Sequence, residues 1–354
     1  MLLYNFFKVR YIMRNIKDIT INKAVIHIID NSMDQPILNQ KELYLTDDTL
    51  DFIGKHIAKA SSDEEAKYAK FNGNNDILDI CRQGIYENEK FLEVSNIFAE
   101  KVFSSCKSTG LIPSGDLLVV KFECEYGKML AIMKMIYNKT FIHHIDYENE
   151  TMTIDIKPQY IGLPDTMQRL QKCAFVNLES DDGEILVVNR PTKQEKEAKN
   201  VNTFIDEILK CTLIDDKRDF TKSFAQTSEK WVRENLKDDA GEAEMVRREI
   251  GEVLRNEDFI DIKEVASSVF KDEEMAESYV EALKETGIKE EKIEIDKEWV
   301  GKKLKRKKLK IDKDMEIYIN AEAYNDINRF QIKKNGDGTI DIVIRQVRNY
   351  FEKQ

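Results

Sequence analysis

Alternating apolar and polar positions between residues 115 and 157 predict the strands around which the rest of the chain is organised. In the first run, Leu118, Val120, Phe122, Cys124 and Tyr126 alternate with Lys121, Glu123 and Glu125, which is the period of a half-buried strand. Gly127 permits a tight reversal. The return run, residues 128–137, is apolar on both faces, so we expect it near the centre of its sheet. Two further runs, residues 141–147 and 151–157, extend the prediction to an antiparallel meander.

Other segments predict strands and helices that accompany this meander. Strand patterns occupy residues 18–30, 173–178 and 184–189. The cluster Thr46-Asp47-Asp48 is a helix N-cap signal, and the apolar stripe from Phe91 to Val102 predicts a longer helix. We therefore predict an N-terminal α+β domain over residues 15–191, with a mainly antiparallel sheet and covering helices. Residues 1–14 are expected to be an upstream extension, with Met13 as an alternative start.

Beyond Pro191 the apolar period changes to 3.6, which predicts a helical middle domain over residues 192–298. Its stripe includes Phe204, Ile208 and Cys211, followed by Phe220, Phe224 and Trp231, which we expect to be core residues. A strand pattern at 315–319 and a hairpin around Asn335-Gly336-Asp337-Gly338 predict a small C-terminal β region over residues 299–354. The fold class expected for the whole chain is α+β.

Composition limits the class of protein. The 354 residues are 42% hydrophobic and 34% charged, and the formal net charge is −11, so the chain is not basic overall. The five cysteines are dispersed and form no CxxC motif, which argues against a disulfide framework or a zinc cluster and favours a reducing cytoplasm. No run approaches 18 apolar residues, so we expect no membrane span.

The sign of the charge changes abruptly near residue 300. Residues 238–298 carry 21 acidic and 9 basic residues, a local balance of −12, whereas residues 301–354 carry 14 basic and 8 acidic residues, a balance of +6. Seven positive charges fall within nine residues, and we call them the basic segment: Lys302, Lys303, Lys305, Arg306, Lys307, Lys308 and Lys310.

The basic segment is our candidate DNA-binding site. Lysine and arginine neutralise phosphates and release condensed counterions, which needs no contact with the bases. A lysine-rich composition favours backbone contact over bidentate reading of guanine, so binding is expected to be largely independent of DNA sequence. In the competing interpretation, these lysines are the solvated face or guarded edge of a strand, or pair with the acidic segment upstream.

Several collinear stretches resemble one known family. They include "ITINKAVIHIID", "FAEKVFSSCKSTGLIPSGDLLVVKFECEYGKMLAIMKM", "CAFVNL", "FIDEILKCTLIDDKRDFTKSFAQTSEKWVRENL" and "MEIYINAEAYNDINRFQIKKNGDGTIDIVI". From about Ile16 to about Ile344 the chain resembles the bacterial nucleoid-associated protein family NdpA. The resemblance implies a cytoplasmic protein that associates with the compacted chromosome, binds double-stranded DNA and forms a homodimer. DNA-topology proteins or other nucleoid proteins are further expected partners.

Candidate catalytic and metal-binding residues are few. His143 and His144 are adjacent on a predicted strand and so point to opposite faces, which disfavours a shared metal ion. Asp116, Glu123 and Glu125 are the carboxylates that a metal-dependent nuclease could use, but no lysine stands two residues after either glutamate. Cys124 alternates with apolar residues and is interpreted as packing rather than as a nucleophile.

We therefore expect a non-enzymatic protein with no catalytic residue, metal or cofactor. Two alternatives stay open. One is a protein-interaction module that acts on other DNA-handling proteins, and the other is a metal-dependent nuclease.

Overall fold

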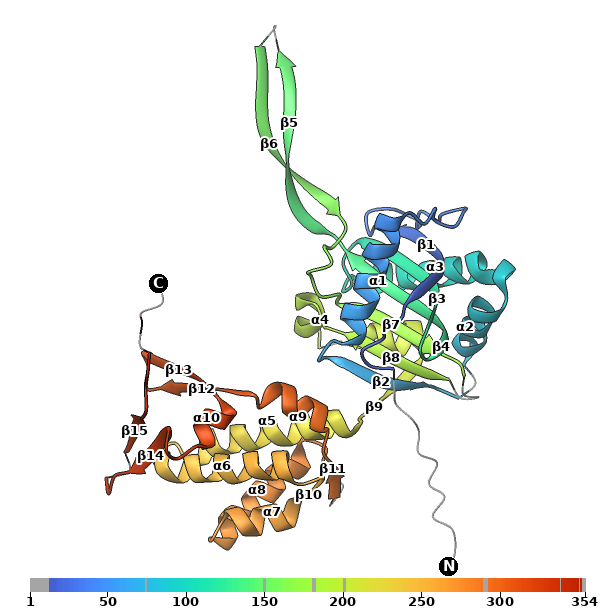
Figure 1. Cartoon of the computed structure of the whole chain (residues 1–354). Coiled ribbons are helices and arrows are strands. Elements are labelled where there is room, and N and C mark those ends of the chain that lie inside the picture. The colour runs from blue at the N-terminus through green and yellow to red at the C-terminus, as the bar shows by residue number, and fades with distance from the viewer. Residues whose placement is uncertain are drawn as a thin grey trace, which may run out of the picture. The chain divides into compact units, whose positions relative to one another are not determined.

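The computed structural model describes residues 13–73, 75–148, 151–179, 183–199, 202–288, 292–337, 339–349 and 351. The chain divides into two compact units, residues 1–214 and residues 215–354. Both units combine helices with antiparallel strand pairs, which confirms the predicted α+β class (Figure 1). The domain boundaries expected after residues 14, 191 and 298 stay a prediction. Residues 1–12, most of the expected extension, lie outside the described residues.

The first unit is built on one large antiparallel sheet. Within the described residues it has seven strands, in the spatial order β1 (Thr20–Ile29), β3 (Gly115–Cys124), β4 (Gly127–Ile136), β7 (Lys172–Asn177), β8 (Glu184–Asn189), β2 (Ala66–Phe71) and β9 (Cys211–Ile214). The turn at Gly127, where φ is +92°, joins β3 to β4 as expected, and Cys124 pairs with Gly127 across it. The return run lies between β3 and β7 and is buried almost throughout, as its apolar pattern predicted.

Both faces of the large sheet are covered, because its strands carry apolar side chains on each face. Leu130, Ile132 and their neighbours pack against α2, α3 and η2 on one face. Met129, Met133 and Met135 pack on the other face with residues of α1. The helices of this unit are α1 (Asp47–Ser61), α2 (Asp76–Tyr86), η1 (Asn88–Lys90), α3 (Phe91–Thr109), α4 (Lys193–Glu197) and η2 (Phe204–Leu209). Thr46 caps α1 by accepting a hydrogen bond from the Thr49 amide, as the sequence predicted.

Two sequence expectations need correction. The four-strand meander is not one sheet: β5 (Asn138–Glu148) and β6 (Thr151–Gly162) pair with each other in a separate ribbon, while β3 and β4 belong to the large sheet. Phe204, Ile208 and Cys211 are not part of the helical core that follows. They are buried in the first unit, where η2 covers the sheet and β9 pairs with β2.

The second unit has its own apolar core. Phe224 and Trp231 are buried there, which confirms that they are core residues. Its elements are α5 (Lys217–Asn235), α6 (Ala240–Asn256), β10 (Phe259–Asp261), α7 (Ile262–Val269), α8 (Glu273–Glu285), β11 (Lys292–Glu294), α9 (Lys297–Lys303), β12 (Arg306–Ile311), β13 (Met315–Asn320), α10 (Ala321–Asn325), β14 (Phe330–Lys334) and β15 (Ile340–Ile344). The last two strands form the expected terminal hairpin, of which Gly338 lies outside the described residues.

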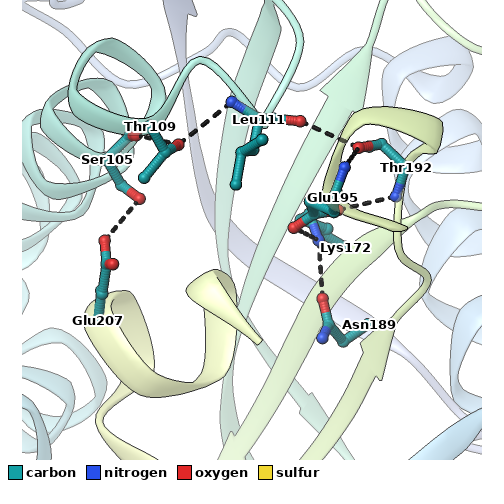
Figure 2. A network of polar contacts seen from close by, with 8 residues as sticks. All are labelled: Ser105, Thr109, Leu111, Lys172, Asn189, Thr192, Glu195 and Glu207. Carbon is teal, nitrogen blue, oxygen red and sulfur yellow. Dashed lines mark hydrogen bonds and ion pairs between the residues drawn. The ribbon is translucent and has the colours of Figure 1, made fainter. Parts of the chain in front are cut away.

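A buried polar network joins several elements of the first unit (Figure 2). The Lys172 ammonium lies 2.8 Å from Glu195 and donates to the Asn189 side chain at 2.8 Å, and both charged side chains are fully buried. Glu195 also accepts from the Thr192 amide, while the Thr192 hydroxyl donates to the carbonyl of Leu111 beyond the end of α3. Burial lowers the pKa of Lys172, and the Glu195 carboxylate opposes that shift. The network therefore fixes α4 against β7 and the end of α3.

Removing one member of this ion pair should destabilise the first unit strongly. Glu195→Leu leaves the Lys172 ammonium buried without its counter-charge, which costs about 3–5 kcal/mol of unfolding free energy. The double variant Glu195→Leu with Lys172→Met should recover most of that loss, because no charge stays buried. Guanidinium unfolding followed by far-UV circular dichroism checks both. Equal stability of the single and double variants would contradict this role.

Candidate nucleic-acid interface

The basic segment begins in the last turn of α9, which is anchored in the core of the second unit. Asp296 caps this helix by accepting a hydrogen bond from the Trp299 amide at 2.9 Å. Trp299 and Val300 are buried, so the helix presents Lys302 and Lys303 on its exposed side. Cations in a last helical turn also interact favourably with the negative end of the helix dipole. The first part of the basic segment is thus held on a fixed element.

The period of β12 divides the rest of the basic segment between two faces. Arg306, Lys308 and Lys310 are exposed, whereas Lys307, Leu309 and Ile311 are half-buried on the opposite face. β12 is paired with β13, which places the three exposed cations opposite Asn320, Tyr318 and Glu316. Lys305 precedes the strand and is exposed, and its carbonyl accepts a hydrogen bond from the amide of Ala321. Six of the seven predicted site residues are therefore exposed.

Lys307 is the exception among the predicted site residues. Its ammonium lies 3.6 Å from the centre of the Tyr324 ring, on the side of β12 that faces away from the three exposed cations. Burial lowers the pKa of Lys307 to about 8; Glu244 opposes this shift, and the positive charges of Arg255, Arg248 and Arg247 reinforce it. Lys307 thus contributes to packing of the strand against Tyr324 rather than to the exposed charge.

Nearby acids already neutralise part of the exposed charge. The Lys302 ammonium lies 2.5 Å from Glu298 one turn earlier in α9. The Lys308 ammonium lies 2.9 Å from Glu316 on β13 and 5.3 Å from the centre of the Tyr318 ring. Such exposed pairs contribute little to stability, because water and salt screen the two charges. A polyanion can therefore displace these two acids at small cost. The pair between Lys302 and Glu298 does agree with the competing interpretation, in which the lysines pair with acidic residues upstream.

A pocket of about 430 Å³ lies beside Lys305, between the end of α9 and the start of α10. Its lining includes Arg255 at the end of α6, Lys305, and, at the start of α10, the acidic residue Glu322. The other lining residues are Val300, Gly301, Leu304, Asn320 and Ala321. Both terminal nitrogens of the Arg255 guanidinium are buried and have no hydrogen-bond partner in the described part of the chain, and burial lowers the pKa of this group. An anion entering the pocket would satisfy this guanidinium.

Sequence reasoning missed the arginines of α6. Arg247 and Arg248 act electrostatically on Lys307, and Arg247 also makes a bidentate pair with Glu229 at 2.8 and 3.0 Å. Arg255 lies seven residues after Arg248, which on a helix returns to nearly the same side. This seven-residue spacing could have identified the arginines from the sequence. It was overlooked because they lie within residues 238–298, whose net charge is −12.

The other candidate residues are not brought together. Asp116 and Glu123 lie near opposite ends of β3, about 23 Å apart at the usual rise per residue. His143 and His144 point to opposite faces of the ribbon, opposite Ile156 and Asp155. Within the described residues no group of three or more His, Cys, Asp and Glu side chains is placed to hold a metal ion. Burial raises the pKa of the Cys124 thiol to about 11, so this cysteine is protonated at neutral pH.

Together these features define an anionic α+β protein with a compact cationic surface on its second unit. The sequence model of the family described as nucleoid-associated protein YejK matches residues 25–352. The chain therefore belongs to this family of nucleoid-associated proteins, in agreement with the resemblance found in the sequence. A search of curated proteins gave no match. None of the helices in the described ranges combines the length and apolar character needed to cross a bilayer.

The lowered pKa of Lys307 predicts how the stability of the second unit depends on pH. Between about pH 8 and 10.5 the unfolded chain holds a proton on this lysine that the folded chain has lost, so the folded state gains stability as pH rises through that window. Lys307→Met should show a smaller gain than wild type. Fluorescence-detected guanidinium unfolding measures this selectively, because both tryptophans, Trp231 and Trp299, are buried in the second unit.

Lys308→Met is the matched control, because Lys308 is on the exposed face of the same strand and its pKa is raised by Tyr318 and Glu316. It should keep the wild-type gain between pH 8 and 10.5. Parallel pH profiles for wild type and Lys307→Met would show that Lys307 is not desolvated in the folded protein.

Proposed function

We propose that the protein binds double-stranded DNA through the phosphate backbone, using the exposed part of the basic segment. The proposal rests on six exposed cations that follow one another along the chain. Lys302 and Lys303 are in the last turn of α9, Lys305 is in the turn that follows, and Arg306, Lys308 and Lys310 are on the exposed face of β12. Membership of a nucleoid-associated family supports DNA as the polyanion. In this proposal Lys307 does not contact DNA; it packs on Tyr324 on the other face of β12.

The chemistry of these side chains favours contact with phosphates over reading of the bases. Five of the six are lysines, whose ammonium groups act as point charges, and only Arg306 could form a bidentate contact with guanine. The two terminal nitrogens of Arg255, which have no hydrogen-bond partner among the described residues, lie in the pocket beside Lys305 and offer a deeper position for one phosphate. The interaction is therefore set by charge and shape, with little dependence on sequence.

The proposal requires no reaction and no cofactor. The nuclease alternative is disfavoured by the positions of Asp116 and Glu123, which β3 holds at its opposite ends. Localisation at the nucleoid in the cytoplasm follows from the proposed DNA contact. The homodimer and the other nucleoid partners implied by the resemblance stay predictions at this point.

DNA binding should weaken steeply with salt. If about five phosphates are neutralised, log K should fall with log salt at a slope of roughly −4 to −5. Replacing the six exposed cations by Gln should reduce affinity on the order of 100-fold or more at about 0.1 M salt and bring the slope close to zero. Gel-shift or anisotropy titrations of one duplex at several salt concentrations provide the measurement, and a duplex of unrelated sequence tests sequence independence.

A charge-matched variant separates local charge from net charge. It replaces six exposed lysines of the first unit by Gln: Lys41, Lys55, Lys128, Lys193, Lys196 and Lys199. Both variants lose six positive charges, so both have the same formal net charge. The first-unit variant should keep nearly wild-type affinity and salt slope. An equal loss of affinity in the two variants would place the DNA contact outside the basic segment or make it a net-charge effect.

A further inference from the structure

The ribbon formed by β5 and β6 extends away from the large sheet of the first unit (Figure 1). Its register sorts the side chains into two unlike faces, because residues opposite each other on paired strands point to the same side. One face, which we call the apolar face, carries Phe141, His143, Ile145 and Tyr147 from β5 and Pro158, Ile156, Ile154 and Met152 from β6. The opposite face carries Thr140, Ile142, His144 and Asp146 with Gln159, Lys157, Asp155 and Thr153.

The apolar face is exposed to solvent. Its six large aliphatic and aromatic side chains range in exposed fraction from 44% for Ile145 to 72% for Tyr147 and Ile156. With about 150–250 Å² for each large side chain, their exposed surface sums to roughly 700 Å². That is larger than the apolar patches usual on monomers, about 300–600 Å², and close to the roughly 800 Å² that each partner contributes to a standard interface.

An isolated pair of strands does not explain this surface. A two-stranded hairpin is marginally stable by itself and needs a third strand or a packed face. An alternation of apolar and polar residues on paired strands is the pattern of a sheet with one covered side. The ribbon therefore has the sequence of a half-buried sheet whose cover is not supplied by the described residues of its own chain.

The charge of the ribbon argues against DNA as the cover. Residues 138–148 and 151–162 contain two lysines and no arginine, against three acidic residues. A strand pair that enters a DNA groove or follows its backbone needs an excess of cations. On the apolar face itself no lysine, arginine, aspartate or glutamate is present among the eight residues. The partner is therefore an apolar protein surface.

We propose that the cover is the same face of a second copy of this chain. The face is nearly symmetric about the His144–Asp155 pair: large side chains, Phe141 and Tyr147, stand at its two ends on β5, and Ile154 and Ile156 stand in its middle on β6. A two-fold axis at this centre lays two ribbons face to face as a four-stranded sandwich. Tyr147 and Met152 of one copy then pack on Phe141 and Pro158 of the other. No formal charge is buried, so each face is a suitable partner for its own copy.

This interaction is independent of DNA and predicts a dimer in nuclease-treated, full-length protein. The test uses two double variants. One carries Ile154→Lys and Ile156→Lys on the apolar face, and the control carries Thr153→Lys and Gln159→Lys on the opposite face of the same strand. Both variants add two positive charges to β6. Sedimentation velocity and light scattering across a dilution series, without DNA, give the mass of each species.

Wild type and the Thr153/Gln159 variant should have twice the chain mass of 41.3 kDa. The Ile154/Ile156 variant should dissociate to the single-chain mass, with the dissociation constant raised on the order of 100-fold or more, because charges would be buried at the contact. A monomeric wild type, dimers in all three proteins, or monomers in both variants would each overturn the proposal. The proposal would also be overturned if the wild type were monomeric and a different protein bound the apolar face. The DNA titrations give a separate result, because they report on the second unit.

Discussion

An anionic chain can approach a polyanion only where its cations are dense enough to dominate the local field. The formal net charge of −11 makes the mean interaction with DNA repulsive, but at physiological salt charges are screened beyond about 8 Å. What matters is therefore which side chains lie within that distance of a bound phosphate. The second unit meets this constraint by concentrating six exposed cations between the end of one helix and one face of the following strand. The −12 balance of the preceding segment is distributed over other elements, chiefly α6 to α8.

The same constraint explains why the basic segment is attached to rigid elements. Trp299 and Val300 hold α9 in the core, and β13 pairs with β12 along its whole length. Charges held on fixed elements lose little conformational freedom when phosphate binds. Lys307 contributes to that rigidity by packing on Tyr324, at the cost of desolvating its amine. Glu298 and Glu316 form exposed ion pairs with Lys302 and Lys308. Such pairs contribute little, so both lysines can exchange these carboxylates for DNA phosphates.

Local features of the fold were predictable because they depend on side chains close in sequence. The strand that contains Leu118, the turn at Gly127 and the cap at Thr46 appear where their patterns placed them. The expectation that this strand is half-buried was wrong: Lys121, expected on the polar face, is buried, because both faces of the sheet are covered. The separation of β5–β6 from the large sheet was not predictable, since the period of two is the same in a ribbon and in a sheet. The placement of β2 between β8 and β9, like the burial of Phe204 and Ile208 in the first core, depends on contacts between residues far apart in the chain.

The candidate site was predictable as a charge run but not as a surface. Its residues were identified by density alone, and the inward position of Lys307 follows only once β12 is recognised as a strand. Arg255 was missed because its neighbours in sequence are acidic, while its neighbours in space are Lys305 and the end of α9. Sequence composition averages over the chain, whereas the field at a phosphate is set by three-dimensional proximity.

Lysine acetylation footprinting, read by mass spectrometry with and without a DNA duplex, shows which amines DNA covers, because it reports each lysine separately. If DNA binds the basic segment, the exposed amines of Lys302, Lys303, Lys305, Lys308 and Lys310 should be strongly protected, while the exposed first-unit lysines Lys193 and Lys196 keep their reactivity. Protection confined to the first unit, or spread evenly over both units, would contradict DNA binding by the basic segment.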